Sequence, residues 1–188
     1  MNWENDIGNC LRTLRSGGVI LFPTDTIWGL GADATSETAV QRIFELKKRP
    51  GEKGLIILLA DPRDIIQYIS APDPGLFDYL DAIQEPTTVV LDGAIGLAEN
   101  CTAPDGSIGI RIVKDEFCRH LIKRFGKPIT ATSANPSGEP TPATFAKVTA
   151  AVREGVDYIV QYRQQEQEVH QASRLVKWNK DGTVTTLR

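Results

Sequence analysis

The sequence predicts an α/β fold in which a mixed β-sheet is flanked by helices, and three observations lead to it. Apolar runs of strand length alternate with segments whose apolar residues recur at helical spacing. The alternation is not strict, which favours a mixed sheet over a purely parallel one. No internal repeat and no convincing linker divides the 188 residues, which are enough for one domain with a hydrophobic core. We therefore expect a single domain over residues 1–188.

Each element follows from local signals. Apolar spacing predicts helices at 5–16, 36–48, 61–69, 76–83, 116–125 and 141–153, and Asp61-Pro62 and Thr141-Pro142 are typical helix starts. Short apolar or β-branched runs predict strands at 19–22, 55–59, 87–91, 108–113, 128–132 and 157–160. The turn "NKDG" between 174–178 and 183–187 predicts a hairpin. The polar, Gln-rich segment 161–171 is expected to be an exposed excursion.

The composition is that of a globular protein of the cytoplasm. Apolar residues make up 41% and charged residues 24% of the chain. No apolar run approaches the roughly 20 residues that span a bilayer, and the acidic N-terminus does not resemble a signal peptide. The three cysteines form no C-x-x-C pair, which favours free thiols in a reducing compartment.

The charge distribution is more informative than its total. A net charge of −3 argues against a general nucleic-acid binder. Residues 42–53 nevertheless hold five cations and two anions, and residues 111–127 hold six cations and two anions. Residues 61–85 hold six anions and one cation. The chain can therefore build a basic face for a phosphorylated ligand or RNA, although a solvated helix surface would give the same pattern.

Two predicted strands end in similar polar sequences. "VILFPTDT" and "PITATSAN" each run from apolar residues into hydroxyls, a carboxylate or an amide. Ligands of α/β folds bind beyond the carboxyl ends of strands, so these ends would supply Thr24, Asp25 and Thr26 on one side and Ser133 and Asn135 on the other. Ordinary turn and cap chemistry explains either loop alone.

A basic cluster lies in "ELKKRPGEK", at the end of a predicted helix. Lys47, Lys48, Arg49 and Lys53 there offset the helix dipole by about 0.3–1 kcal/mol each. That benefit does not require four cations, whereas a nucleoside triphosphate does need several, and arginine can fork two hydrogen bonds to one phosphate.

Other kinds of site lack their residues. There is no G-x-x-x-x-G-K-[ST], and "GLGADA" is not G-x-G-x-x-G. The two histidines, His120 and His170, have no metal-ligand spacing and make a Ser-His-Asp triad improbable, and Cys118 belongs to an apolar stripe. The chemistry should therefore rest on positioning and charge stabilisation, which suits phosphoryl or nucleotidyl transfer.

"PTDTIWGLG", "ELKKRPGEKGLIIL", "SIGIRI" and "TATSANPSGEPT" together resemble the YrdC-type threonylcarbamoyl-AMP synthases over roughly residues 8 to 160. The resemblance implies a YrdC-like twisted mixed sheet with a positively charged concave face. It implies synthesis of threonylcarbamoyl-AMP from L-threonine, bicarbonate and ATP with Mg²⁺, as a nucleotidyltransferase that supplies tRNA threonylcarbamoyladenosine modification with partner proteins. Two alternatives stay open: a non-catalytic double-stranded RNA-binding module, and a relative with another substrate.

The resemblance also implies roles for particular residues. Lys47 and Arg49 would be catalytic and, with Lys53, would face phosphates. The remaining ATP-binding residues would be Thr88, Ser133, Asn135 and Thr141. The threonine-binding residues would be Thr24, Thr26, Trp28, Ser107 and Arg111. No protein residue is assigned to the metal.

The sequence departs from the family pattern at several positions. Trp28 stands where the family has Tyr or Phe, and Glu85 replaces the glycine of a Pro-Gly-Pro motif of which Pro86 and Thr88 remain. Leu58 stands where longer relatives have histidine, and Ser173-Arg174 stand where they have Ser-Thr.

Overall fold

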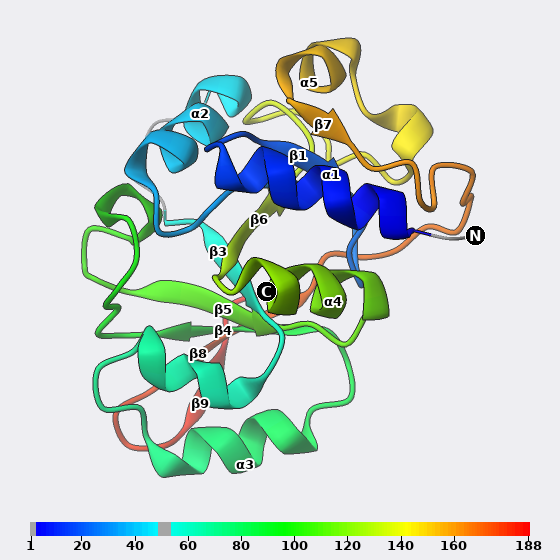
Figure 1. The fold of residues 1–188 in the computed structure, drawn as a ribbon. Helices are drawn as coiled ribbons and strands as arrows, with labels where there is room; N and C mark the ends of the chain where they lie inside the picture. The colour runs from blue at the N-terminus through cyan, green and yellow to red at the C-terminus, as the bar shows by residue number, and fades with distance from the viewer. Residues whose placement is uncertain (1–2, 49–53) are drawn as a thin grey trace.

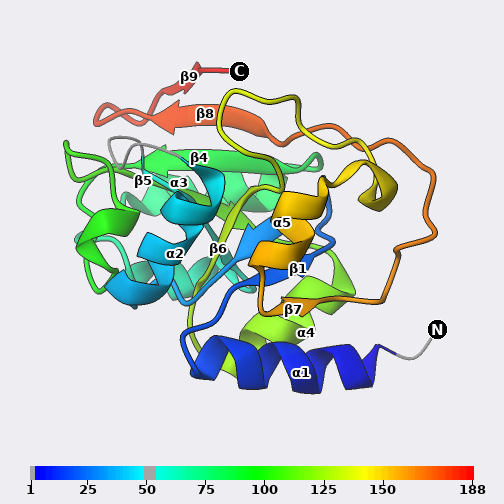
Figure 2. The ribbon, with the colours of Figure 1, turned by 90° about the horizontal axis from the view of Figure 1, so that it is seen from above.

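One nine-stranded sheet runs through the computed structural model, which describes residues 3–48 and 54–188 (Figures 1 and 2). The strand order is β7-β1-β2-β6-β3-β5-β4-β8-β9. β1–β7, β3–β5 and β4–β8 pair in parallel and the other neighbours are antiparallel, which confirms the mixed sheet. The strands are β1 Ile20–Phe22, β2 Gly29–Gly31, β3 Ile56–Leu59, β4 Thr87–Leu91, β5 Ile108–Ile112, β6 Ile129–Ser133, β7 Tyr158–Ile159, β8 Arg174–Trp178 and β9 Val184–Thr186.

Helices α1 and α4 lie side by side across one face of the sheet (Figures 1 and 2). Their apolar stripes, which include Leu14 on α1 and Leu121 on α4, are buried as the helical spacing predicts. The helices are α1 Glu4–Arg15, α2 Glu37–Lys47, α3 Pro74–Ala82, α4 Glu116–Phe125 and α5 Ala150–Gly155, with 3-10 turns η1 Pro62–Gln67, η2 Glu99–Cys101 and η3 Phe145–Lys147. Within residues 3–48 and 54–188, no helix has both the length and the apolar character needed to cross a bilayer.

Two segments differ from the sequence prediction. The expected helix at 141–153 is wrong, because residues 141–144 are not helical and α5 begins only at Ala150. Phe145 packs on Trp28, with ring centroids 4.8 Å apart, and this contact outweighs the local Thr-Pro signal. Strand β2 was not expected, because Gly-Leu-Gly has low strand propensity; it forms because both neighbouring strands pair with it.

The strand order explains where the site lies. β2 is antiparallel to both β1 and β6, so β1 and β6 run in the same direction with one strand between them. Their carboxyl ends therefore reach the same edge of the sheet, as the sequence analysis expects.

Candidate active site

A cavity of about 570 Å³ opens where the β1 and β6 ends meet the sheet face, a volume within the range of roughly 300–1,000 Å³ usual for small-molecule sites. Its floor is a row of neighbouring residues across the sheet. Ile56 pairs with both Gly109 and Ala131, and glycine and alanine there leave room for a ligand. The lining also includes Thr24, Thr26, Gly29, Gly54, Val90, Ser107, Arg111, Ser133, Thr141, Ala172, Ser173 and Arg188.

The loop between β1 and β2 is fixed by its own threonines. The Thr24 hydroxyl donates to the Ile27 carbonyl (2.8 Å), accepts from the Thr26 amide (3.1 Å) and lies 3.0 Å from the Thr26 hydroxyl. Both threonines are buried and both line the cavity. The polar residues that end β1 therefore preorganise one cavity wall.

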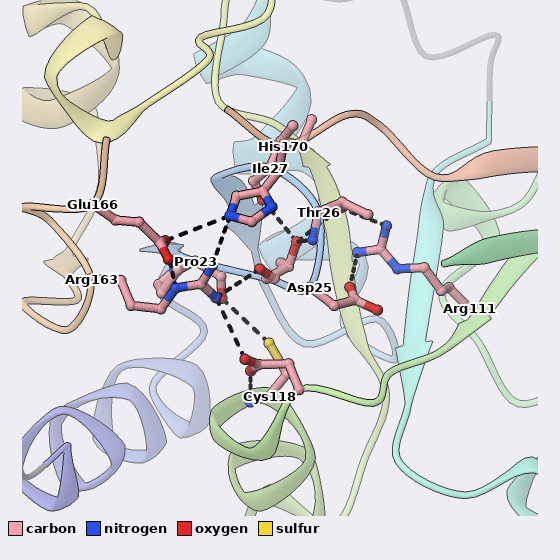
Figure 3. Close-up of polar contacts among 11 residues, drawn as sticks. Pro23, Asp25, Thr26, Ile27, Arg111, Cys118, Arg163, Glu166 and His170 are labelled. Atoms are coloured by element: carbon pink, nitrogen blue, oxygen red, sulfur yellow. Dashed lines mark hydrogen bonds and ion pairs between the residues drawn. The ribbon is translucent and has the colours of Figure 1, made fainter. Parts of the chain in front are cut away.

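Arg111 places a fixed positive charge in that wall. Arg111 lies on β5, is 5% exposed, and donates from Nη1 to the Thr26 hydroxyl at 2.9 Å. Nη2 lies 3.3 Å from the Asp25 carboxylate, and Nε has no hydrogen-bond partner among the described residues (Figure 3). Burial raises the pKa of Asp25 above the usual aspartate range, against the opposing effect of Arg111 and with a smaller contribution from Asp115. Such a buried guanidinium suits a carboxylate or phosphate ligand.

Lys47 and Asn135 shape the loop after β6. Lys47 is 3% exposed, and its ammonium donates to the carbonyls of Ser133 (2.5 Å) and Asn135 (2.6 Å). The Asn135 amide donates to the carbonyls of Pro136 (2.9 Å) and Glu139 (2.8 Å). Neither side chain is among the described lining residues, whereas Ser133 and Thr141 are.

The other predicted site residues fall in different places. Ser107 lines the cavity, and its hydroxyl donates to Asp105 at 2.6 Å. Thr88 is fully buried and lies 2.8 Å, hydroxyl to hydroxyl, from Ser173. Trp28 does not line this cavity; it packs on Phe145 and borders a separate small hollow. Arg49 and Lys53 lie outside the described residues.

Several lining residues were not among the predicted site residues, and three of them come from the last part of the chain. Ala172 and Ser173 come from the chain between β7 and β8, and Arg188 follows β9 and donates to the Ser173 carbonyl at 3.3 Å. For Ser173 the sequence did offer a signal, because Ser173-Arg174 stand at the positions of the Ser-Thr pair in longer relatives. Nothing local marks Arg188, because only the sheet order brings it to the cavity.

The segment 161–171 corrects a further expectation. Several of its residues are exposed, but Arg163, Glu166 and His170 are half-buried and contact one another against the Thr24 loop (Figure 3). This part of the chain therefore packs behind the Thr24 loop and is not simply an exposed excursion, although the lining of the cavity begins only at Ala172.

Comparison with known proteins agrees with this fold. The threonylcarbamoyl-AMP synthase of Idiomarina loihiensis is 33% identical to this chain over 146 residues, covering 76% of this chain and 78% of the relative. The structure of P. abyssi Sua5 complexed with L-threonine matches with a TM-score of 0.86 at 27% identity, over 98% of this chain and 54% of that one, so this chain spans about half of that Sua5. E. coli YciO matches in fold, with a TM-score of 0.82 at 20% identity over 98% of this chain and 88% of that one. The family model for Sua5, YciO and YrdC proteins, described as telomere recombination, matches residues 12–188, and this chain therefore belongs to that family.

Proposed function

We propose that this protein is an L-threonylcarbamoyladenylate synthase, which forms threonylcarbamoyl-AMP and pyrophosphate from L-threonine, bicarbonate and ATP. The single observation that carries the proposal is the cavity that joins Thr26, the buried Arg111 and Ser133 in a member of the Sua5, YciO and YrdC family. The relatives named threonylcarbamoyl-AMP synthase and the threonine-bound Sua5 support the same assignment.

In this proposal the substrates provide the reacting groups. The threonine amine takes up carbon dioxide from bicarbonate as a carbamate, and a carbamate oxygen attacks the α-phosphorus of ATP while pyrophosphate leaves. Arg111 and Thr26 bind the amino acid, with Thr24 and Ser107 beside them. Ser133 and Thr141 contact the nucleotide directly, and Thr88 and Asn135 support it by holding Ser173 and the loop after β6. Lys47 acts from behind the loop after β6, where its ammonium holds the Ser133 and Asn135 carbonyls, while Arg49 and Lys53 would stabilise developing charge on the phosphates.

We infer that Mg²⁺ arrives as part of the ATP complex. Among the described residues that line the cavity there is no aspartate or glutamate, so the phosphates themselves are the natural ligands of the ion. Glu166, Glu168 and His170 bring their ligand atoms within 4.8 Å of one another, but the Arg163 guanidinium already bonds to Glu166 at 2.7 Å, and a neighbouring cation disfavours metal binding.

The product would pass to partner proteins that modify tRNA, in the cytoplasm. The three cysteines, Cys10, Cys101 and Cys118, are free and buried, which fits a reducing compartment.

The test is release of pyrophosphate from the purified protein. We expect release only when ATP, L-threonine and bicarbonate are all present, and threonylcarbamoyl-AMP as the product detected by mass spectrometry. Other amino acids in place of threonine identify a relative with a changed substrate. A protein that binds RNA in a salt-dependent manner but releases no pyrophosphate under these conditions would contradict the proposal.

A further inference from the structure

Arg163 lies behind the Thr24 loop, on the side away from Arg111 (Figure 3). Its Nη1 donates to the Thr24 carbonyl at 3.0 Å and lies 3.5 Å from the Asp115 carboxylate at the start of α4. Its Nε donates to Glu166 at 2.7 Å, and its Nη2 lies 3.4 Å from the His170 ring. One guanidinium therefore joins the loop, the helix and the chain that leads to β8.

This contact set needs an arginine. The five N–H donors of a guanidinium point in fixed directions in one plane, so a single side chain reaches several partners at once, which a lysine ammonium on a flexible stem does not. The side chain is 16% exposed and faces two carboxylates, so its charge is compensated. Its backbone has φ of 66°, a left-handed conformation that a residue other than glycine rarely adopts. Such strain persists where the surroundings hold it in place.

The chain between β7 and β8, residues 161–173, depends on this residue. We call it the connector. It is fixed at its start, because Asp6 accepts from the amides of Gln161 (3.0 Å) and Tyr162 (2.9 Å), and at its end by the Thr88–Ser173 hydroxyl pair. Within the described chain, residues 167–172 make no backbone–backbone hydrogen bond. The middle of the connector is therefore held by side-chain contacts, and Arg163 makes those to Glu166 and His170.

The two segments that Arg163 joins, the Thr24 loop and the connector, both reach the cavity. The Thr24 loop forms one wall, and two residues beyond His170 the connector forms another with Ala172 and Ser173. Arg163 itself does not line the cavity. A change at Arg163 therefore alters the distance between two walls without removing any group that faces the ligand.

We propose that Arg163 is a positioning residue for the threonine half of the site, which acts from outside the cavity by fastening the Thr24 loop and the connector to one another and to α4. The inference rests on the proposed function for its kinetic consequence. Its structural consequence, a fixed loop and a fixed connector, is independent of the reaction.

The experiment compares Arg163→Met and Arg163→Lys with the wild type and with the control Arg42→Met. Arg42 bonds to the same kinds of partner, the Asp157 carboxylate at 2.8 Å and the Gly17 carbonyl at 3.4 Å, but neither of these partners lines the cavity. Pyrophosphate release is measured against threonine and against ATP separately, and amide hydrogen exchange is followed over residues 23–28 and 166–175.

In both Arg163 variants we expect the threonine KM to rise on the order of tenfold or more, since displacements of about 1 Å at a site have effects of up to 10²-fold, with a much smaller change in the ATP KM. Amide exchange should accelerate in both segments. Arg42→Met should leave the threonine KM and these segments unchanged.

Equal rises in both KM values, a threonine KM like that of the wild type, or unchanged exchange would overturn the proposal. If Arg163→Met does not fold, Arg163→Lys decides, because it keeps the charge that faces Asp115 and Glu166 but lacks the fork. A wild-type protein that releases no pyrophosphate refutes the proposed function instead, and the exchange comparison then judges the positioning role by itself.

Discussion

At the residue scale, the hydroxyls of Thr24 and Thr26 form hydrogen bonds within their own loop, which limits what they can offer to a ligand. A hydroxyl has one donor and two acceptor positions. Thr24 uses all of its positions within the loop, if Thr26 donates in the pair between them. Thr26 then accepts from Arg111 and keeps one lone pair for the cavity. The paired threonines of the sequence are thus unequal, and Thr26 is the one left to contact a substrate.

Lys47→Ala tests whether the loop after β6 depends on a buried ammonium. The substitution leaves the buried Asn135 carbonyl without this donor, at a cost of about 1–3 kcal/mol, and removes one of the two donors to the Ser133 carbonyl, which still accepts from the Asn135 amide. We expect the free energy of unfolding to fall, and turnover to fall on the order of 10²–10³-fold. Urea denaturation and pyrophosphate release measure the two effects.

Lys48→Ala is the matched control, since Lys48 is the next residue and is exposed. It should change neither stability nor turnover appreciably. A Lys47→Ala protein with wild-type stability would show that the loop is held by other contacts.

Asp25 should make threonine use dependent on pH. Because burial raises the pKa of Asp25, the native protein binds this proton at a higher pH than the unfolded chain, and the ionised carboxylate lowers stability at neutral pH. That cost is relieved as the pH falls through the raised pKa. Protonation also removes the charge that faces Arg111, so we expect kcat/KM for threonine to fall in the same window, which begins above the ordinary value of about 3.9.

The pH profiles of the wild type and Asp25→Asn measure this effect. The variant should be less active at neutral pH and should lack this acid limb, since its amide does not titrate. An unchanged acid limb in the variant would assign the titration to another group.

At the scale of the element, Gly31 shows why β2 contains glycine. A Cβ at this position would lie 2.7 Å from Phe22 and 3.0 Å from Ile129, both fully buried side chains. Gly31 therefore makes room for the core, and of the two glycines of β2 only Gly29 lines the cavity.

Gly31→Ala should therefore destabilise the protein by about 1–3 kcal/mol, the usual cost of overpacking a core. Gly8→Ala is the opposite case, because Gly8 lies within α1 and a Cβ there meets no atom within 4 Å. We expect Gly8→Ala to stabilise by about 0.5–1 kcal/mol, as alanine does in a helix interior. Thermal and urea unfolding measure both changes, and a Gly31→Ala protein as stable as the wild type would show that the core can adjust.

Helix α4 illustrates an element that serves both packing and the site. Asp115 caps it by accepting from the Cys118 amide at 2.8 Å, and the Cys118 thiol donates to the Pro23 carbonyl at 3.3 Å. Burial raises the pKa of the Cys118 thiol well above its usual range, so it stays a neutral donor. The start of α4 therefore supports the Thr24 loop through the Pro23 carbonyl, and the apolar stripe of the same helix packs against α1.

At the scale of the whole molecule, the cavity exists only because the sheet is mixed. Its lining comes mainly from β2, β3, β4, β5, β6 and β8, together with the loop after β1, other loop residues and Arg188, two residues beyond β9. Thr26, Arg111 and Arg188 are far apart in the sequence and share this space through strand pairing. The described lining thus contains two arginines, while the predicted positive face as a whole stays a prediction.

The sequence by itself determined the class of fold, most strands and helices, and the two strand ends that meet at the site. These features depend on local signals: apolar period, caps, turn residues and the polar residues that follow a strand. The helix expected at 141–153 failed because its local signal competed with the packing of Phe145 on Trp28.

Only the tertiary structure decided which polar residues face the cavity and which hold its walls. Lys47 and Asn135 look like ligands in the sequence but bond to loop carbonyls, while Arg163, in a polar segment without a motif, joins two walls. The physical reason is that a side chain's partners are set by long-range neighbours in the folded sheet, which residue type and local spacing do not specify.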